Sequence, residues 1–351
     1  MSARANALAL LLFFAVAAHA DEVPAGWQSC TGIADRDTRL ACFDRWSAGQ
    51  ASAPKQPVAK QQDSDACDHT DPSALSRFWE LDRKTSCGIF GIRGYRPISL
   101  SLVRGGTVND QPTSGNPLNN APNSQPYRKT ETRIQLSVRT KVAQGLLTHG
   151  DGPRDSLWFA YSQQSYWQVF TPWLSRPFRN TDHEPEFIYV YPLTASLPAS
   201  WKLRYAGAGI VHQSNGQSLP LSRSWNRVYV SAGAEHPGGF SLQARVWQRI
   251  HESPEDDDNP HISDYVGRAE VTGSWDVNAD HTLALTYRNN LRGFDKGSVR
   301  LEWMRKIESQ TPSSLGSLRL HAQVFSGYGD SLLDFNRRRT VFAVGLSLVD
   351  W

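Results

Sequence analysis

The chain has 351 residues, with 37 Lys and Arg against 34 Asp and Glu and a formal net charge of +3. This small positive excess, without a basic run interleaved with aromatic residues, argues against a nucleic-acid partner. The mean hydropathy of −0.48 does not separate a water-soluble domain from a transmembrane β-barrel, because only alternate residues of a barrel strand face lipid.

The first twenty residues have the pattern of a secretory signal peptide. A positively charged start precedes the apolar run ALALLLFFAVAA and the small-x-small site Ala18-His19-Ala20. This apolar run is too short to span a bilayer as a helix. We therefore predict a signal peptide over residues 1–20 and a mature chain that begins at Asp21.

Four cysteines lie near the start of the mature chain, at positions 30, 42, 67 and 87. An even number of cysteines in an exported protein favours disulfides, and four cysteines allow three different pairings. Among these we predict Cys30–Cys42 and Cys67–Cys87. The spacing of these cysteines pairs none of them with histidine as a zinc site would require.

The stretch 47–66, SAGQASAPKQPVAKQQDSDA, is rich in Ala, Gln, Lys, Ser and Pro and has no periodic apolar pattern. This composition is typical of a flexible linker. We predict a Cys-containing extension that ends in this linker over 21–66, and a periplasmic lead-in segment over 67–93.

From about residue 94 onward, apolar residues alternate with polar ones. In TRIQLSVRTKV, Ile, Leu and Val fall on one face of a strand, and Arg, Gln, Ser and Lys fall on the other. Twelve segments read in this way as strands: 94–104, 131–147, 156–168, 185–193, 201–214, 224–234, 239–250, 263–276, 281–290, 298–307, 318–328 and 339–351. Short, turn-like connections largely alternate with longer polar ones, and the last residue is an aromatic, Trp351.

This pattern predicts an all-β protein with a twelve-stranded antiparallel transmembrane β-barrel over 94–351, preceded by the short Cys-containing extension. The alternative is a soluble β-sandwich with the same number of strands. Charged residues along one whole face of many strands are easier to place in a polar barrel lumen than on the outside of a sandwich. The predicted signal peptide also favours the transmembrane barrel.

The stretch IVHQSNGQSLPLSRSWNRVYV, residues 210–230, forms the hairpin between the fifth and sixth strands. With both termini in the periplasm, the fifth strand ends at the extracellular rim with His212 and Ser214, whose side chains point to the same face. Asn226 enters from the sixth strand on the face that carries Val228 and Val230, which we expect to meet lipid. A polar cluster on a lipid-facing wall costs free energy, and this cost favours a functional role.

Serine is a poor nucleophile until a base takes its proton, and that base needs a third group to fix its tautomer. Histidine and asparagine can fill these two roles. A His-x-Ser pattern near a turn is nevertheless common, and Ser-Asn-Gly is itself a turn sequence. The residues alone therefore leave two interpretations open, a catalytic hairpin and an ordinary one.

Several motifs, in order, resemble the bacterial outer-membrane phospholipase A family. They are HQSNG (212–216), SRSWNR (222–227), SQQSYWQ (162–168), PFRNTDHEPEF (177–187) and FSGYGDSLLDFN (325–336). The resemblance implies a twelve-stranded barrel in the outer membrane of a Gram-negative bacterium. It also implies hydrolysis of phospholipid acyl esters of the A1/A2 and lysophospholipase type, calcium dependence, and a homodimer as the active form.

Carried over by motif, Ser214 is expected to be the nucleophile, His212 the general base and acid, and Asn226 the residue that orients His212. The active site would face the outer leaflet. Gln213 stands where some members have Asp, which should matter little if its side chain points to the other face. The alternative function is a non-catalytic barrel, either a pore or a surface-binding protein, in which the three residues merely bond one another.

The resemblance also implies a calcium site and a dimer contact. The expected calcium ligands are the Gln217 carbonyl and the Ser222 hydroxyl, with Ser175 of the partner subunit. Gln163 matches a glutamine at the dimer interface of the family. Leu219 stands where some members have an acidic residue that helps to hold calcium in the monomer, so the resemblance does not extend to that secondary site.

Two further polar clusters are weaker candidates. The acidic run PEDDDNP, 254–260, is predicted to be a solvated extracellular loop, although such a run can bind cations and could attract divalent ions. His183 and Glu184 are predicted to lie in a loop over 169–184, where they would serve loop packing or an interface.

Overall fold

The structure is a computed structural model that describes residues 26–52, 67, 70–150, 152–293, 295–307 and 318–348. The predicted signal peptide and residues 53–66 of the predicted linker lie outside the described residues. The chain divides into two units, residues 1–62 and 63–351, and each is described by itself. In the part of the chain that the structure describes, no helix is long and apolar enough to cross a membrane.

The first unit contains two helices, α1 (Gln28–Thr31) and α2 (Arg36–Ser52), joined by the predicted Cys30–Cys42 disulfide. Helix α2 continues to Ser52, so the predicted linker does not begin at residue 47. The physical reason is local: this part of the stretch contains alanine, the best helix former, and its first proline comes only at residue 54.

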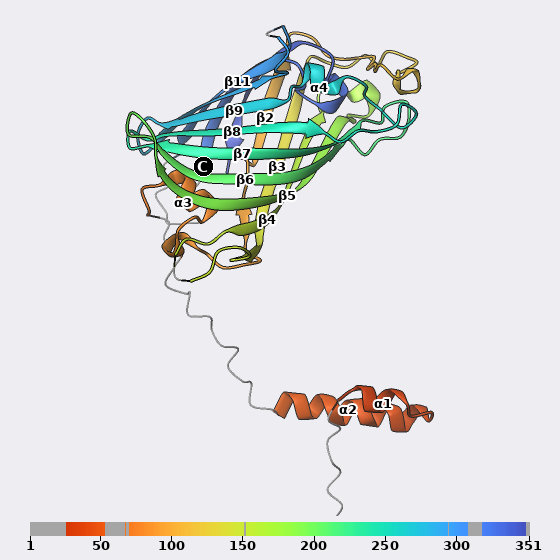
Figure 1. Cartoon of the computed structure of the whole chain (residues 1–351). Helices are drawn as coiled ribbons and strands as arrows, with labels where there is room; N and C mark the ends of the chain where they lie inside the picture. Colours follow the sequence, from red (N-terminus) through yellow and green to blue (C-terminus); the bar gives the residue numbers. More distant parts are fainter. Residues whose placement is uncertain are drawn as a thin grey trace, which may run out of the picture. The chain divides into compact units, whose positions relative to one another are not determined.

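The second unit contains the predicted closed antiparallel barrel of twelve strands (Figure 1). Its strands pair in chain order from β2 to β13, and β13 pairs with β2 to close the ring. The strands are β2 (Ser99–Gly105), β3 (Thr130–Gln144), β4 (Ser156–Trp167), β5 (Phe178–Ser196), β6 (Lys202–Ser214), β7 (Ser224–His236), β8 (Phe240–Arg249), β9 (Ala269–Asp276), β10 (His281–Asn289), β11 (Gly297–Lys306), β12 (Arg319–Gly327) and β13 (Arg339–Ser347). A further short strand, β1 (Ile92–Gly94), pairs with β3.

Short helices lie in the segments before and between the strands. They are α3 (Ala74–Trp79), η1 (Arg83–Thr85), η2 (Pro117–Asn119), η3 (Pro172–Leu174), α4 (Ile262–Tyr265) and η5 (Leu332–Asp334). Helix α3 is at one end of the barrel and α4 is at the other (Figure 1). The end with α4, where β6 finishes and β7 begins, is called the site end below.

The two faces of the strands differ as predicted. Along β3, the charged side chains of Glu131, Arg133 and Lys141 are buried inside the barrel. Along β13, Phe342 and Val344 are exposed on the outside. A closed ring with a polar interior and an apolar exterior has the construction of an outer-membrane barrel, not of a β-sandwich.

Buried ion pairs fill part of the barrel interior. Arg179 contacts Glu131 at 2.6 Å and Asp334 at 3.2 Å. Farther along the wall, Glu270 contacts Arg245 at 2.9 Å and Arg288 at 2.6 Å. Each charge is matched by an opposite one, which limits the free-energy cost of burying it.

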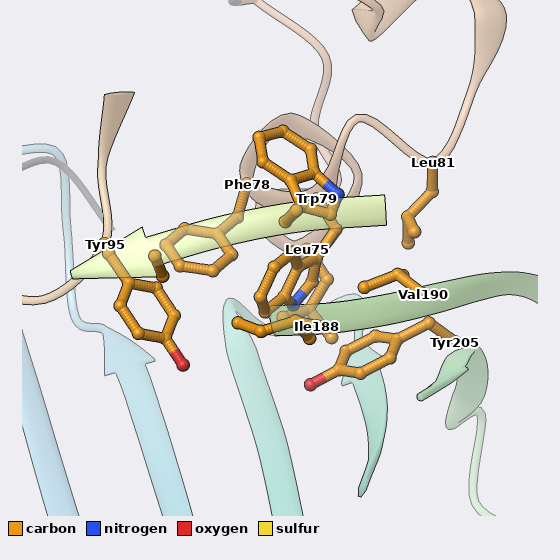
Figure 2. Close-up of a cluster of buried hydrophobic side chains, with 10 residues drawn as sticks. Leu75, Phe78, Trp79, Leu81, Tyr95, Ile188, Val190 and Tyr205 are labelled. Atoms are coloured by element: carbon orange, nitrogen blue, oxygen red, sulfur yellow. The ribbon is translucent and has the colours of Figure 1, made fainter. Parts of the chain in front are cut away.

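Helix α3 packs inside the barrel at the end opposite the site. Its Leu75, Phe78 and Trp79 form one buried apolar cluster with side chains from the barrel wall (Figure 2). The wall contributes Trp158 and Ala160 from β4, Ile188 and Val190 from β5, and Tyr205 from β6. The lead-in segment is thus anchored to β4, β5 and β6, and the predicted Cys67–Cys87 disulfide closes it.

Three predicted strand starts were wrong by five residues or more. Strand β2 begins at Ser99, five residues after the predicted start at residue 94, because residues 92–94 form the separate strand β1. Strand β5 begins at Phe178, seven residues before the predicted start at Pro185. Proline has no N–H to donate to a neighbouring strand and is therefore more common at the first residue of a strand than inside one. For this reason Pro185 resembles a strand start. Here the β5–β6 ladder skips Pro185, with pairs on either side at Glu186↔Val211 and His183↔Ser214, so the strand continues through it. The third error is at β9, which was predicted to begin at residue 263: residues 262–265 form α4, and the strand begins only at Ala269.

Candidate active site

The site is built on the β6–β7 hairpin, where His212 and Asn226 are direct partners in the register. Both lie on the outer face of the barrel, because their neighbours Val211, Trp225 and Arg227 are buried inside. The ring nitrogen Nδ1 of His212 and the amide oxygen Oδ1 of Asn226 are 2.8 Å apart. The structure therefore brings together two of the three predicted catalytic side chains in a direct hydrogen bond.

Ser214 lies two residues beyond His212 on the same outer face of β6. Residues two apart in a strand are separated by about 6.6 Å, a gap that an imidazole ring can span. Within the residues that the structure describes, no hydrogen bond joins Ser214 to His212. Such bonds are often long in the absence of substrate and tighten only in the reacting complex.

Gln213 points the other way, as predicted. Its Oε1 accepts hydrogen bonds from Trp225 Nε1 at 2.8 Å and from Arg227 Nη2 at 3.1 Å inside the barrel. Trp225 is completely buried. The inner face of the hairpin is thus fixed by packing and hydrogen bonds, and this holds the outer face in position.

The loop between the two strands, 215–223, is shaped by buried polar residues. Asn215 donates to the Leu221 carbonyl at 2.7 Å and accepts from the Arg223 backbone N–H at 2.9 Å. The guanidinium of Arg223 donates to the carbonyls of Asn119 at 2.8 Å and Ser222 at 2.6 Å. Burial lowers the pKa of Arg223 to about 10, although the nearby Asp258 acts in the opposite direction.

Asp258 joins this loop from the β8–β9 connection. The Ser222 hydroxyl donates to its Oδ2 at 2.6 Å, and the Asn119 amide donates to its Oδ1 at 3.0 Å. The prediction that the acidic run is simply a solvated loop was therefore wrong for Asp258, and also for Asp257, which pairs with Arg249 at 2.7 Å. No local signal could have found the two Asp258 contacts, because they join residues that are 36 and 139 positions apart in the chain.

The predicted calcium ligands present oxygen atoms, which suit a hard cation. Ser222 and Gln217 lie in the 215–223 loop, and the carboxylate of Asp258 is in contact with Ser222. Ser175 follows η3 and is exposed, so it is accessible to a second copy of the chain. Among the described residues there is no group of three or more His, Cys, Asp and Glu side chains that could hold a metal ion.

Gln163 belongs to a row of polar side chains on the outside of β4 and β5. It accepts from the Tyr161 hydroxyl at 3.0 Å and donates to the Ser165 hydroxyl at 3.2 Å. The same Tyr161 hydroxyl is 2.7 Å from Nδ1 of His183, which lies opposite Ser214 in the β5–β6 register. This polar row leads from Gln163 to Ser214, the predicted nucleophile, and polar groups on a lipid-facing wall are costly unless something covers them.

The expectation that His183 and Glu184 lie in a loop was wrong, because both are on β5. His183 faces outward beside Ser214, whereas Glu184 faces inward and pairs with Arg96 at 2.6 Å and Arg227 at 3.3 Å. The alternation of apolar and charged residues that marks other strands is weak in this segment, where most residues are polar.

Comparisons with known proteins agree with this geometry. The model of the phospholipase A1 family matches residues 75–348. A Neisseria meningitidis serogroup B protein assigned as a phospholipase A1 is 33% identical over 361 residues, which cover 92% of this chain and 90% of that protein. The outer membrane phospholipase A of Escherichia coli superposes with a TM-score of 0.62 at 30% identity, over 74% of this chain and 99% of that one. An outer membrane phospholipase from Salmonella typhi, a dimer with bound calcium, gives a TM-score of 0.64 at 28% identity, over 80% of this chain and 98% of that one.

Proposed function

The chain belongs to the phospholipase A1 family of outer-membrane phospholipases, and we propose that it hydrolyses phospholipid acyl esters with Ser214, His212 and Asn226 as its catalytic residues. Family membership makes it a phospholipase of the outer membrane of a Gram-negative bacterium. The observation that carries the catalytic assignment is the 2.8 Å contact between His212 and Asn226 on the outer wall. A barrel wall has no structural need for this pair where it meets lipid.

Asn226 holds the imidazole in the useful tautomer. When its amide oxygen accepts the Nδ1–H of His212, the other ring nitrogen, Nε2, is left as a free base. Nε2 then takes the proton of the Ser214 hydroxyl as the serine oxygen attacks the ester carbonyl carbon. His212 passes this proton to the departing alcohol, and the acyl group stays on Ser214.

Water completes the cycle. His212 takes a proton from a water molecule as its oxygen attacks the acyl carbon on Ser214, and the proton then returns to the serine oxygen as the fatty acid leaves. The net reaction consumes one water molecule and regenerates all three side chains.

The surroundings of the site suit a lipid substrate. Ile210, Val228 and Val230 are exposed on the same outer face of the hairpin, so acyl chains can lie against the barrel wall while the ester reaches Ser214. We propose that the site faces the outer leaflet. The support for this orientation is that the longer connections lie at the site end, as in outer-membrane barrels with long extracellular loops.

Calcium fits the oxygen atoms near the nucleophile. We propose that the Gln217 carbonyl and the Ser222 hydroxyl hold it together with Ser175 of the partner subunit. Bound there, calcium would supply positive charge that stabilises the oxyanion of the tetrahedral intermediate. The contact between Ser222 and Asp258 supports the site, since the carboxylate adds the negative charge that a divalent cation needs.

The active form is proposed to be a homodimer that covers the polar row containing Gln163. Burying these side chains against a second copy would remove them from lipid and let them make hydrogen bonds across the contact. The related Salmonella typhi protein is a dimer with bound calcium, which supports the same arrangement here.

The proposal is tested by fatty-acid release from phospholipid, with the barrel purified in detergent and calcium supplied. We expect the wild type to release fatty acid, and Ser214→Ala to lose the activity by several orders of magnitude. Ser326→Ala, which changes an outward-facing serine on β12, is the matched control and should keep wild-type activity. Equal activity of Ser214→Ala and wild type would refute the nucleophile.

A wild type without activity, together with ion conductance in planar bilayers, would instead favour a non-catalytic pore. The structure argues against that outcome, because buried ion pairs and α3 occupy the interior of the barrel.

A further inference from the structure

A carboxylate on the β8–β9 connection contacts the third catalytic residue. The amide nitrogen Nδ2 of Asn226 donates to Oε1 of Glu252 at 3.1 Å. The same connection is fixed to the backbone of Asn226, because the Ile250 N–H donates to the Asn226 carbonyl at 2.8 Å. Glu252 is therefore held against Asn226 by its own side-chain bond and by the main-chain bond of Ile250, two residues earlier.

This contact determines which way the Asn226 amide points. An ionised carboxylate only accepts hydrogen bonds, so the amide end that faces Glu252 must be the NH₂ group. The amide oxygen must then face His212. If the amide were turned over, its NH₂ group would face Nδ1 of His212, and the proton of the neutral ring would have to sit on Nε2. That tautomer cannot accept the proton of Ser214.

Glu252 is itself held in place. Its second oxygen, Oε2, is 2.9 Å from Nη2 of Arg249, and Arg249 also contacts Asp257 at 2.7 Å. The side chains of Arg249 and Glu252 are 14% and 17% exposed. One carboxylate oxygen is thus committed to Arg249 and the other to Asn226, in a place partly shielded from water, where such bonds are stronger than at an open surface.

We propose that Glu252 is a positioning residue that acts through Asn226: it fixes the amide orientation and so keeps the base nitrogen of His212 unprotonated and available. The proposal rests on the proposed function, because it assumes that His212 and Asn226 serve Ser214. The three catalytic residues Ser214, His212 and Asn226 are then followed by one positioning residue, Glu252, which Arg249 supports.

The test is a double-mutant cycle on the full chain in detergent with calcium, with kcat and KM measured for fatty-acid release. Because the hydrogen bond to a charged group is lost, Glu252→Ala should lower kcat by about tenfold to a hundredfold with KM nearly unchanged. In an Asn226→Ala background, the same change should have almost no further effect, because Glu252 acts only through the missing amide. The matched control is Glu255→Ala, in the same acidic loop with an exposed side chain, which should keep wild-type kcat.

Glu252→Gln is the conservative variant, and it also decides the matter if Glu252→Ala does not fold. A glutamine keeps the shape but can either donate or accept, so it no longer excludes the turned-over amide. We expect its kcat to lie between those of the wild type and Glu252→Ala. The proposal would be overturned if Glu252→Gln and Glu252→Ala both kept the wild-type kcat. If the alanine variant does not fold, a wild-type kcat for Glu252→Gln alone would overturn it. Equal losses from Glu252→Ala in the two backgrounds would overturn it too, since they would show a structural role independent of Asn226.

Ser214→Ala is measured in the same series to separate the two proposals. If it is inactive while Glu252→Ala keeps wild-type kcat, the positioning role fails and the catalytic assignment stands. If Ser214→Ala keeps wild-type activity, the catalytic assignment itself fails, and the positioning role fails with it.

Discussion

Replacing Trp79 by alanine removes the aromatic group that anchors α3 inside the barrel. The indole is 4% exposed, and its ring centroid lies 4.9 Å from that of Phe78, 5.9 Å from Trp158 and 5.8 Å from Tyr205. A Phe or Trp to Ala change in a packed core costs roughly 3–5 kcal/mol, and the cost rises with the cavity left behind. A closed barrel wall cannot collapse far into the space, so we expect a loss near the upper end of this range.

The catalytic geometry should survive this change. Tyr205, the β6 residue in the cluster, is seven residues from His212 on the same strand, which corresponds to about 23 Å at roughly 3.3 Å per residue. The hairpin is fixed separately by Trp225 and Gln213 at the site end. We therefore expect Trp79→Ala to keep wild-type kcat at temperatures where the barrel remains folded.

The assay is urea-induced unfolding in detergent micelles, followed by Trp fluorescence and by the electrophoretic shift of the folded barrel. Trp173→Ala is the matched control, because this indole is 53% exposed and should change the free energy of unfolding little. A change below about 1 kcal/mol for Trp79→Ala would show that α3 is not packed against the wall as described. A large fall in kcat for the folded variant would show that the two ends of the barrel are coupled.

Three further changes have defined outcomes. Ser222→Ala should raise the calcium concentration for half-maximal hydrolysis by about tenfold or more, since it removes one oxygen ligand; an unchanged calcium titration would reject that role. Burial raises the pKa of Asp155, but hydrogen bonds from Thr148 and Tyr189 outweigh it and leave the pKa at about 2. The stability that Asp155 contributes is therefore present above the ordinary carboxyl pKa and is lost as the pH falls toward 2, so Asp155→Asn should unfold with a weaker pH dependence below pH 4 than the wild type. Gln163→Ala should weaken calcium-dependent dimerisation in sedimentation experiments, whereas Gln164→Ala, which faces inward, should not; equal dimerisation of the Gln163 variant and wild type would remove Gln163 from the interface.

Much of the barrel was predictable because its pattern is local. Side chains alternate between lumen and lipid with a period of two, so the strand count and the orientation of residues such as Arg133 and Val344 follow from the order of residues alone. The errors fall where this alternation fails. Around His183 nearly every residue is polar, and before Ala269 a short helix precedes the strand.

The residues of the site also divide into those that local sequence could place and those that it could not. His212, Ser214 and Asn226 belong to one hairpin, so their spacing in the chain was enough to place them together. Glu252 and Asp258 reach the hairpin from a different loop. Their positions depend on how that loop folds across the rim, and no periodic pattern in the sequence encodes this.

The central claim is that Ser214 is the nucleophile and His212 its base. It is tested most directly by treating the folded barrel, with calcium present, with an alkyl sulfonyl fluoride, which forms a sulfonate ester on an activated serine as fluoride leaves. The modified residue is then identified by peptide mass spectrometry. We predict a single modified serine, Ser214, with loss of hydrolysis in proportion to modification, and no adduct in His212→Ala. An adduct on another serine that abolishes hydrolysis, or full hydrolysis by protein modified at Ser214, would contradict the assignment.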